Sequence, residues 1–219
     1  MEVNISIDES LKQIIRLGCV QFDQVKVTTR HEAIVNENDE LVMALRARYS
    51  SPADAMEKLN ITRSLYRNIG IDPTKNRSSS EALLRRVLKG NTLYQVNSIV
   101  DICNLCSLNL LLSLGLYDVD SIKGRIKLRL GKKGESYDGI RKEQVNVTGR
   151  FTLIDDLGPF GNPSADSART MITESTTHLL FVIFAPSNYD EKVLTEHLDF
   201  IEGKVAQYHP CQTVVKKLV

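Results

Sequence analysis

The stretch Asn91–Gly124, NTLYQVNSIVDICNLCSLNLLLSLGLYDVDSIKG, contains the longest apolar run of the chain. Its apolar residues cover most sides of a helix, and a helix that is apolar on most sides is a buried one. We expect this helix to end at Gly115, because glycine readily adopts the left-handed conformation that closes helices. The sequence therefore predicts a central helix, followed by a strand, around which the rest of the chain is arranged.

Four polar residues interrupt this apolar run: Asp101, Asn104, Ser107 and Asn109. Asn104 is three residues from Asp101 and from Ser107, so these side chains are neighbours on the helix surface. A polar group that enters a core must be hydrogen-bonded or must face a cavity. These residues therefore either bond to neighbouring loops or line the floor of a pocket.

The chain of 219 residues is long enough for one sizeable domain. Its composition, 42% hydrophobic and 25% charged, is ordinary for a soluble globular protein. The net charge of +1 creates no global field towards nucleic acid, so any phosphate-binding surface must be local. No apolar run is long enough to span a bilayer, and the start MEVNISIDES lacks the features of a signal peptide. We expect a cytoplasmic protein without membrane contact.

Four cysteines occur, at positions 19, 103, 106 and 211. Cys103 and Cys106 have the spacing of a redox or zinc motif, but they lie inside the apolar helix and lack two further ligands at matching spacing. The four histidines form no metal-binding pair, and no phosphate loop or nucleophile elbow is present. We therefore expect structural cysteines, and neither a metal nor a cofactor.

Several other segments have a clear periodicity or clear end signals. Strands are expected at Val3–Ile7, Cys19–Thr28, Arg125–Leu130, Phe151–Ile154, Thr177–Ala185 and Thr213–Val219, and helices from Asp8 to Gly18, up to Arg48, from Ser51, and at Ile61–Gly70, Glu81–Lys89 and Glu191–Gln207. Two glycines and two prolines predict a shaped loop at Leu157–Ser164, which either exposes backbone amides to a ligand or is a rigid connection.

Three groups of residues resemble a known family. They are Val100–Asn104 with the apolar run, Tyr117–Asp120 and Lys123–Gly124; Tyr66–Arg86 upstream; and Gly134–Glu135, Asp155–Asp156 and Gly158–Pro163 downstream. Residues 62–188 resemble the B-three/B-four domain, the editing domain of the phenylalanyl-tRNA synthetase beta subunit, and Tyr66–Arg86 is similar to its free-standing members. The resemblance implies a mixed α/β domain with a central β-sheet flanked by helices. Residues 1–61 would be an α/β extension packed on it, and 189–219 a helix and strand that complete it.

The resemblance also implies a function in tRNA proofreading. Nothing in the chain resembles an ATP-binding or aminoacylating module, so a complete synthetase is excluded. The implied activity is the trans-acting hydrolysis of mischarged aminoacyl-tRNA, an editing deacylase with tRNA or aminoacyl-tRNA as its partner. The alternative is a non-catalytic module that binds tRNA or an amino acid. DNA is not an expected partner.

The candidate site residues follow from the same resemblance. Asn104 matches an asparagine of the family, whereas Cys103, Gly115 and Val182 stand where the family has threonine, its catalytic histidine and its glutamate. The residues expected to position a water are therefore Asn104, Asp118 and Glu81. Expected substrate-binding residues are Ser107, Gly115, Gly158, Phe160, Gly161 and Asn162.

Two groups of cations are candidates for contacts to tRNA phosphates. Arg67, Arg77, Arg85 and Arg86 belong to a helix-loop-helix unit, and Arg125, Lys127 and Arg129 share one face of the Arg125–Leu130 strand. A helix N-terminus flanked by arginines is a ready anion site. The alternative for the strand is a merely solvated face, and for Ser78 and Glu81 a capping box that only fixes the helix start.

Overall fold

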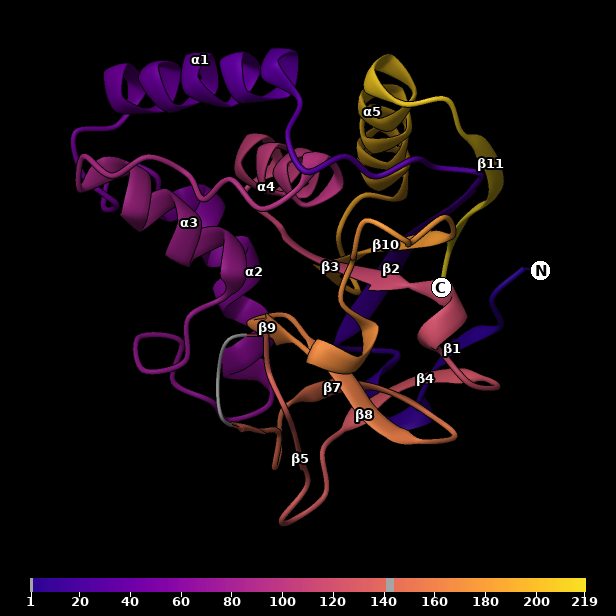
Figure 1. Cartoon of the computed structure of the whole chain (residues 1–219). Coiled ribbons are helices and arrows are strands. Elements are labelled where there is room, and N and C mark those ends of the chain that lie inside the picture. Colours follow the sequence, from indigo (N-terminus) through magenta and orange to yellow (C-terminus); the bar gives the residue numbers. More distant parts are fainter. Residues whose placement is uncertain (1, 141–143) are drawn as a thin grey trace.

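The computed structural model describes residues 2–140 and 144–219, within which five α-helices accompany two main β-sheets, and the five-stranded sheet lies at the end of the molecule away from α1 and α5 (Figure 1). The helices are α1 (Glu32–Arg48), α2 (Met56–Asn68), α3 (Ser79–Leu88), α4 (Ser98–Leu110) and α5 (Glu191–Tyr208). Short 3-10 helices are η1 (Glu9–Leu11), η2 (Val119–Ser121) and η3 (Ala168–Thr170). The mixed α/β class expected from the sequence is confirmed.

The first sheet is antiparallel and has the order β11-β2-β10-β3, formed by Gln212–Leu218, Ile15–Asp23, Leu179–Pro186 and Ser113–Asp118. The second has the order β1-β4-β7-β8-β9, formed by Ile5–Ile7, Ile126–Leu130, Phe151–Asp155, Gly158–Asn162 and Ala165–Asp166. In it, β1 runs parallel to β4 and the other neighbours are antiparallel. A small ribbon pairs β5 (Ser136–Tyr137) with β6 (Val145–Asn146).

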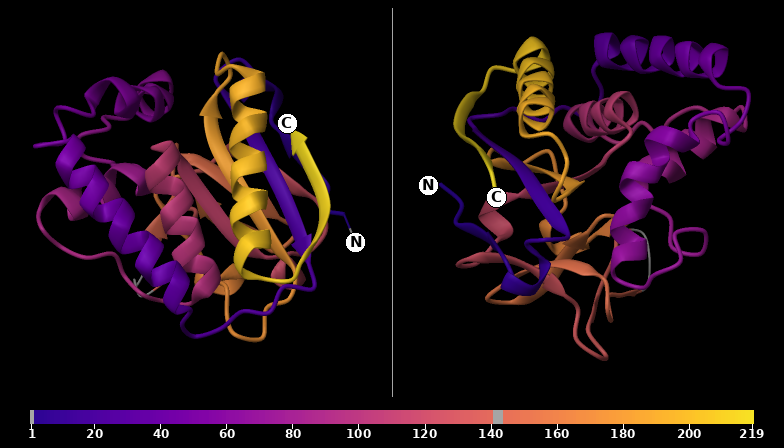
Figure 2. Two further views of the ribbon diagram at one scale, coloured as in Figure 1. Left: turned by 90° about the horizontal axis from the view of Figure 1, so that it is seen from above. Right: turned by 180° about the vertical axis from the view of Figure 1, so that it is seen from behind.

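The four-stranded sheet is buried on both faces. On one face, Phe181 and Ile183 share a core cluster with residues of α4 and α5, and α5 covers this face, running roughly along the strands (Figure 2, left). On the other face, Val182 and Phe184 pack against residues of the five-stranded sheet such as Leu153. Because successive side chains of a strand point to opposite faces, β10 serves both clusters and reads as a continuous apolar run.

A third apolar cluster joins the helices α1 to α4, with Leu59, Leu84 and Leu108 among its buried members. An ion network reinforces the contact of α2 with α3. Arg63 donates two hydrogen bonds to the Glu81 carboxylate, at 2.8 and 2.7 Å, and Arg85 donates a third at 2.8 Å. Burial opposes the charged form of Glu81, but the Arg63 and Arg85 guanidinium groups outweigh it and lower the pKa of Glu81 below its ordinary value.

A buried tyrosine hydroxyl ties the two sheets together. Tyr117 in β3 is fully buried, and its ring meets that of Phe160 in β8 edge-on, with 5.1 Å between centroids. A Cβ atom on either Gly115 or Gly161 would overlap the Tyr117 hydroxyl oxygen. These glycines are therefore required for space, since any side chain would displace the ring.

The structure confirms the buried strand ending near Ala185, the long helix from Glu191 and the closing strand. It corrects four other expectations. The segment from Asp8 to Gly18 forms only η1 before β2 begins, and the helices expected from Ser51 and at Ile61–Gly70 are one helix, α2. The strand expected up to Thr28 stops earlier, because β2 ends at Asp23. The expected loop at Leu157–Ser164 contains β8.

The central helix also ends earlier than expected, at Leu110, and Leu111 adopts the left-handed conformation with a φ of 53°. The Thr62 hydroxyl donates to the Leu111 carbonyl, and the Ser107 hydroxyl donates to the Leu112 carbonyl. These hydrogen bonds hold a turn that glycine would normally occupy. In the part of the chain that the structure describes, no helix has the length and apolar character needed to cross a membrane.

Gly161→Ala is expected to lower the free energy of unfolding by about 1–3 kcal/mol, because the added methyl group overpacks the Tyr117 slot. Gly203→Ala is the matched control: its Cβ meets nothing within 4 Å, and alanine in the interior of α5 should add about 0.5–1 kcal/mol. Urea denaturation of both variants tests this. Equal stability of Gly161→Ala and the wild type would contradict the packing argument.

Glu81→Ala is expected to cost about 3–5 kcal/mol, because it leaves Arg63, which is only 8% exposed, without its partner. The lowered pKa of Glu81 means that this stabilisation is complete above its ordinary value of 4.5 and is lost as the pH falls below it. In thermal melts between pH 7 and pH 3, the difference in stability between wild type and variant should therefore shrink towards the acid end. Glu40→Ala, on the exposed face of α1, should change stability by less than about 0.5 kcal/mol.

Candidate functional site

A cleft of about 910 Å³ opens beside α4. Its wall on one side is formed by α4 and the segment before it, and on the other side by β9, η3 and the residues that follow η3. The lining residues are Tyr94, Val96, Val100, Asn104, Ile140, Ser164, Ala165, Asp166, Ala168, Met171 and Ile172. A deeper extension of about 170 Å³ shares most of these residues and adds Ser79, Cys103, Leu114, Leu116 and Asn162.

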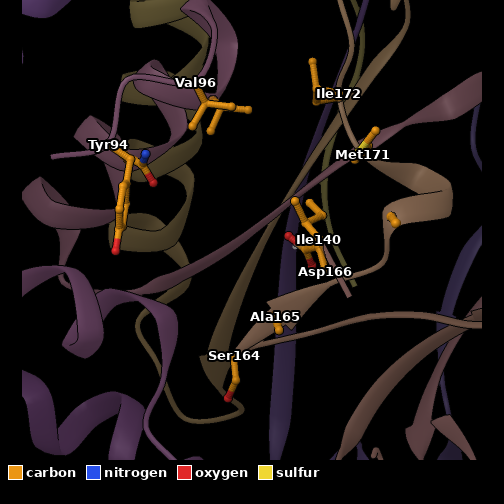
Figure 3. A pocket seen from close by; sticks show the side chains of 11 residues that line it. Tyr94, Val96, Ile140, Ser164, Ala165, Asp166, Met171 and Ile172 are labelled. Atoms are coloured by element: carbon orange, nitrogen blue, oxygen red, sulfur yellow. The ribbon is translucent and has the colours of Figure 1, made fainter. Parts of the chain in front are cut away.

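The rim of the cleft is unusually apolar for an exposed surface. Tyr94, Val96, Ile140 and Met171 are 53%, 39%, 41% and 39% exposed, and all four line the cleft. Figure 3 shows Tyr94 and Val96 on one side of the opening, with Ile140 and Met171 on the other. Clustered exposed apolar side chains around a cavity are typical of a binding site. The cleft can therefore hold a flat or apolar group between two lips.

Among the described residues, Asp166 in β9 is the one that brings a carboxyl group to the floor of the cleft. Tyr117 donates a hydrogen bond from its hydroxyl to Asp166 Oδ1 at 2.8 Å, and the Leu116 backbone amide donates another to the same carboxyl. Burial of the carboxyl outweighs these two donors and raises the pKa of Asp166 to about 7. The group therefore changes charge near neutral pH, as residues at functional sites often do.

Asn104 from α4 lines both the cleft and its extension. Among the described residues, none forms a hydrogen bond with its side chain, so its carboxamide is available to a ligand. Cys103 lies beside it in the extension, and burial raises the pKa of its thiol well above the ordinary value. Cys103 is thus a protonated, apolar wall residue rather than a nucleophile.

A shallow recess continues the cleft towards α3, lined in part by Ser79, Arg86, Tyr94 and Asn104. Arg86 stacks on the Tyr94 ring, with 3.8 Å from its guanidinium carbon to the ring centroid, and donates a hydrogen bond to the Tyr94 hydroxyl. These contacts hold the Arg86 cation beside Tyr94, where it lines the recess. Among the described residues that line the cleft, its extension and the recess, Arg86 is the one cation.

The structure separates the predicted site residues into three groups. Asn104 and Asn162 line the cleft or its extension. Gly115, Phe160 and Gly161 lie behind the floor, where they surround Tyr117. The remaining residues, Ser107, Glu81, Asp118 and Gly158, do not line the cleft or its extension.

These remaining residues have structural partners of their own. Ser107 donates to the Leu112 carbonyl, and Glu81 is held by arginines as described above. Asp118 accepts hydrogen bonds from the Thr176 hydroxyl and the Asp120 amide. Gly158 forms the β7–β8 turn with a φ of 117°. Ser78 caps α3 by accepting from the Glu81 amide, but the Glu81 carboxylate does not return the bond, because it binds Arg63.

The N-terminus of α3 is not an open anion site. The Ser79 amide donates to the Pro163 carbonyl at 3.0 Å, and the Tyr66 and Ser164 hydroxyls, 2.6 Å apart, form a second link between α2 and the β8–β9 turn. Asn162 shapes this turn by accepting from the Ser164 and Ala165 amides. The expectation of an exposed helix start is therefore wrong, since the hairpin covers it.

The cations of the two predicted surfaces also differ in their partners. On β4, Lys127 pairs with Asp8 at 2.8 Å and Arg129 with Glu135 at 2.7 Å, while Arg125, just before the strand, is exposed. On the helix-loop-helix unit, Arg85 pairs with Glu81, whereas Arg67 and Arg77 are exposed. Only part of each set therefore presents unneutralised charge to a polyanion.

Sequence reasoning missed Asp166 and the apolar rim. Asp166 follows the two glycines and two prolines of the expected loop, and it pairs with Gly161 across the β8–β9 hairpin. An interpretation of that segment as a hairpin would have placed Asp166 opposite the glycine. The exposed apolar residues come from segments far apart in the chain, so no local pattern connects them.

Within residues 2–140 and 144–219, no three His, Cys, Asp or Glu side chains are grouped as a metal site would require. The chemistry available in the cleft is that of a carboxyl with a pKa near 7, an unpaired carboxamide and apolar walls. Such a set can position and deprotonate a water beside an ester or amide carbonyl.

Comparisons with known proteins identify the family. The B3/4 domain model matches residues 61–192, which confirms the resemblance predicted from the sequence. No curated protein is significantly similar to the chain. Among solved structures, an N-terminal fragment of the phenylalanyl-tRNA synthetase beta subunit from Pyrococcus horikoshii is similar, with a TM-score of 0.47 and 14% identity.

That similarity covers 96% of this chain and 50% of the synthetase fragment, so the chain spans half the length of the fragment. The family match alone covers more than half of the chain. The protein belongs to the B3/4 domain family.

Proposed function

We propose that this protein hydrolyses mischarged aminoacyl-tRNA and that the cleft holds the aminoacylated 3′ end. One observation carries the proposal: the cleft brings a carboxyl group, Asp166, and an unpaired carboxamide, Asn104, into one apolar-walled cavity. A water beside the carboxyl and an ester carbonyl beside the carboxamide have the groups that hydrolysis needs. Membership of the B3/4 family, to which the synthetase editing domain belongs by the resemblance above, supports tRNA as the carrier of the ester.

The shape and polarity of the cleft support an aminoacyl-adenosine end as its occupant. The apolar lips, Tyr94 and Val96 facing Ile140 and Met171, can sandwich a base or an aromatic side chain. The deep extension is lined mainly by apolar residues such as Leu114 and Leu116, with Asn104 and Asn162 as polar groups. It can therefore take an amino-acid side chain while the ester lies near the floor.

The tRNA backbone is proposed to approach along α3 rather than along β4. Arg86 lines the recess that continues the cleft, and Arg77 and Lys89 are exposed at either end of the same helix. Lys127 and Arg129 of β4 are already paired with carboxylates, which reduces the gain from a phosphate contact. The non-catalytic binding module remains the second candidate, because it would use the same cleft without proton transfer.

Asn104→Ala is expected to slow deacylation by about 10²–10³-fold, because it removes the donor that would stabilise the oxyanion. The assay follows release of the amino acid from a panel of tRNAs, including tRNA charged with tyrosine. Asn109→Ala is the matched control, since Asn109 lies on the exposed side of α4 and donates to the Leu105 carbonyl, its one side-chain hydrogen bond to a described residue. Tight tRNA binding by the wild type without any release would favour the binding module instead.

Arg86→Ala is expected to weaken tRNA binding and to reduce the slope of log K against log salt concentration by about 1, the effect of losing one phosphate contact. Lys192→Ala, which removes an exposed cation on α5, should leave both quantities unchanged. Filter binding between 50 and 200 mM salt, about the range in which such contacts are screened, measures the slope. If Lys127→Ala weakens binding more than Arg86→Ala, the approach along β4 would replace the one proposed.

A further inference from the structure

We propose that Asp166 transfers the proton in the hydrolytic step and that the Tyr117 hydroxyl is the positioning group that aims it. This assignment rests on the hydrolysis proposed above. Asp166 is the only carboxylate among the described residues that line the cleft and its extension. No ion pair among the described residues involves it, so its outer oxygen is not committed to a cation.

Asp166 belongs to an edge strand of two residues, yet several groups on the side away from the cleft hold its carboxyl in place. The Tyr117 hydroxyl and the Leu116 amide both donate to its carboxyl. The slot that admits the hydroxyl is cleared by Gly115 in one sheet and Gly161 in the other. A fixed carboxyl with donors on one side directs its remaining lone pairs towards the opposite side, which is the cleft.

Among the described residues, the titratable groups that interact with Asp166 are neutral at pH 7. They are Tyr117 on β3, Cys103 on α4 and Tyr137 on β5, and burial raises the pKa of all three. Among the residues that the structure describes, no cation counteracts the burial of Asp166, which raises its pKa to about 7. At neutral pH both protonation states are populated, which suits a residue that must first accept and then return a proton.

The step balances in atoms and charge. The Asp166 carboxylate takes a proton from water as the water oxygen bonds to the ester carbonyl carbon, and the carbonyl oxygen becomes an oxyanion beside the Asn104 amide group. The carbon–oxygen bond to the ribose then breaks. Asp166 returns its proton to the departing ribose oxygen, so that free amino acid and uncharged tRNA are released and the enzyme is unchanged.

The test begins with deacylation of a panel of mischarged tRNAs between pH 5 and pH 9. The wild-type rate should rise with pH and level off above about 7, the pKa of the base. Asp166→Asn should lower the plateau by about 10²–10⁴-fold, the usual contribution of a general base, with tRNA binding retained. Asp138→Asn, which changes an exposed aspartate, is the matched control and should leave the profile unchanged.

Tyr117→Phe separates a positioning role from a merely structural one. The variant keeps the ring and its contact with Phe160, but it removes a donor that favours the charged carboxyl. The acid limb of the pH–rate profile should therefore move to higher pH. An unmoved limb would show that the Tyr117 hydroxyl does not influence the Asp166 carboxyl, and it would overturn the positioning role.

Stability provides a readout that does not need activity. The pKa of Asp166 is higher in the folded state than its ordinary value of 3.8, so folding is favoured when the carboxyl is protonated. The wild type should therefore lose stability relative to Asp166→Asn as the pH rises from about 4 to 7. A difference independent of pH would overturn the raised pKa on which the role depends.

The outcomes distinguish the two proposals. If the wild type releases amino acids and Asp166→Asn does so at the same rate, the role of Asp166 is overturned and the hydrolase stands. If the wild type releases no amino acid from any tRNA of the panel at any pH, both are overturned. Loss of release in Asp166→Asn, with a shifted limb in Tyr117→Phe, supports both.

Discussion

The hydrogen bond from the Tyr117 hydroxyl to Asp166 is the interaction on which the arrangement of the cleft depends. Tyr117 belongs to the four-stranded sheet and Asp166 to the edge of the five-stranded sheet, so this bond fixes the relative position of the two sheets at the floor of the cleft. A buried hydroxyl must have a partner, and a buried carboxyl without a cation must be neutralised or supported by donors. The Tyr117 hydroxyl and the Asp166 carboxyl are donor and acceptor for each other, so both buried groups are hydrogen-bonded.

The helical side of the cleft is fixed by a different set of contacts. The buried Arg63–Glu81 pair holds α2 against α3, and the Ser79 amide and Tyr66 hydroxyl connect these helices to the β8–β9 turn. Some polar side chains that the sequence suggested as catalytic groups, above all Glu81, instead form the hydrogen bonds and ion pairs that hold these helices together. Among the described residues, the amide and carboxyl groups left to face the cleft are those of Asn104, from α4, and of Asp166, on the floor.

Much of the fold follows from patterns that the sequence displays. The apolar run of β10 and the amphipathic α5 lie where periodicity places them, because their burial is continuous along each element. Local rules failed at Gly115 and Leu111, for a reason that is tertiary. Hydrogen bonds from Thr62 and Ser107 let a leucine end α4, while Gly115 is needed in a strand to admit a tyrosine hydroxyl. The site was only half predictable for the same reason: Asn104 lies on the helix that could be recognised, but Asp166 depends on a hairpin register.

The covered start of α3 has a consequence for how a ligand would be admitted. Because the β8–β9 turn is bonded to both α2 and α3, the wall that it forms cannot swing aside without breaking contacts to two helices. Little conformational entropy then remains to be lost on that side when a molecule is bound, and discrimination between ligands would come from a preformed shape. A molecule too wide for the cleft would therefore be excluded, because this wall would not move to admit it.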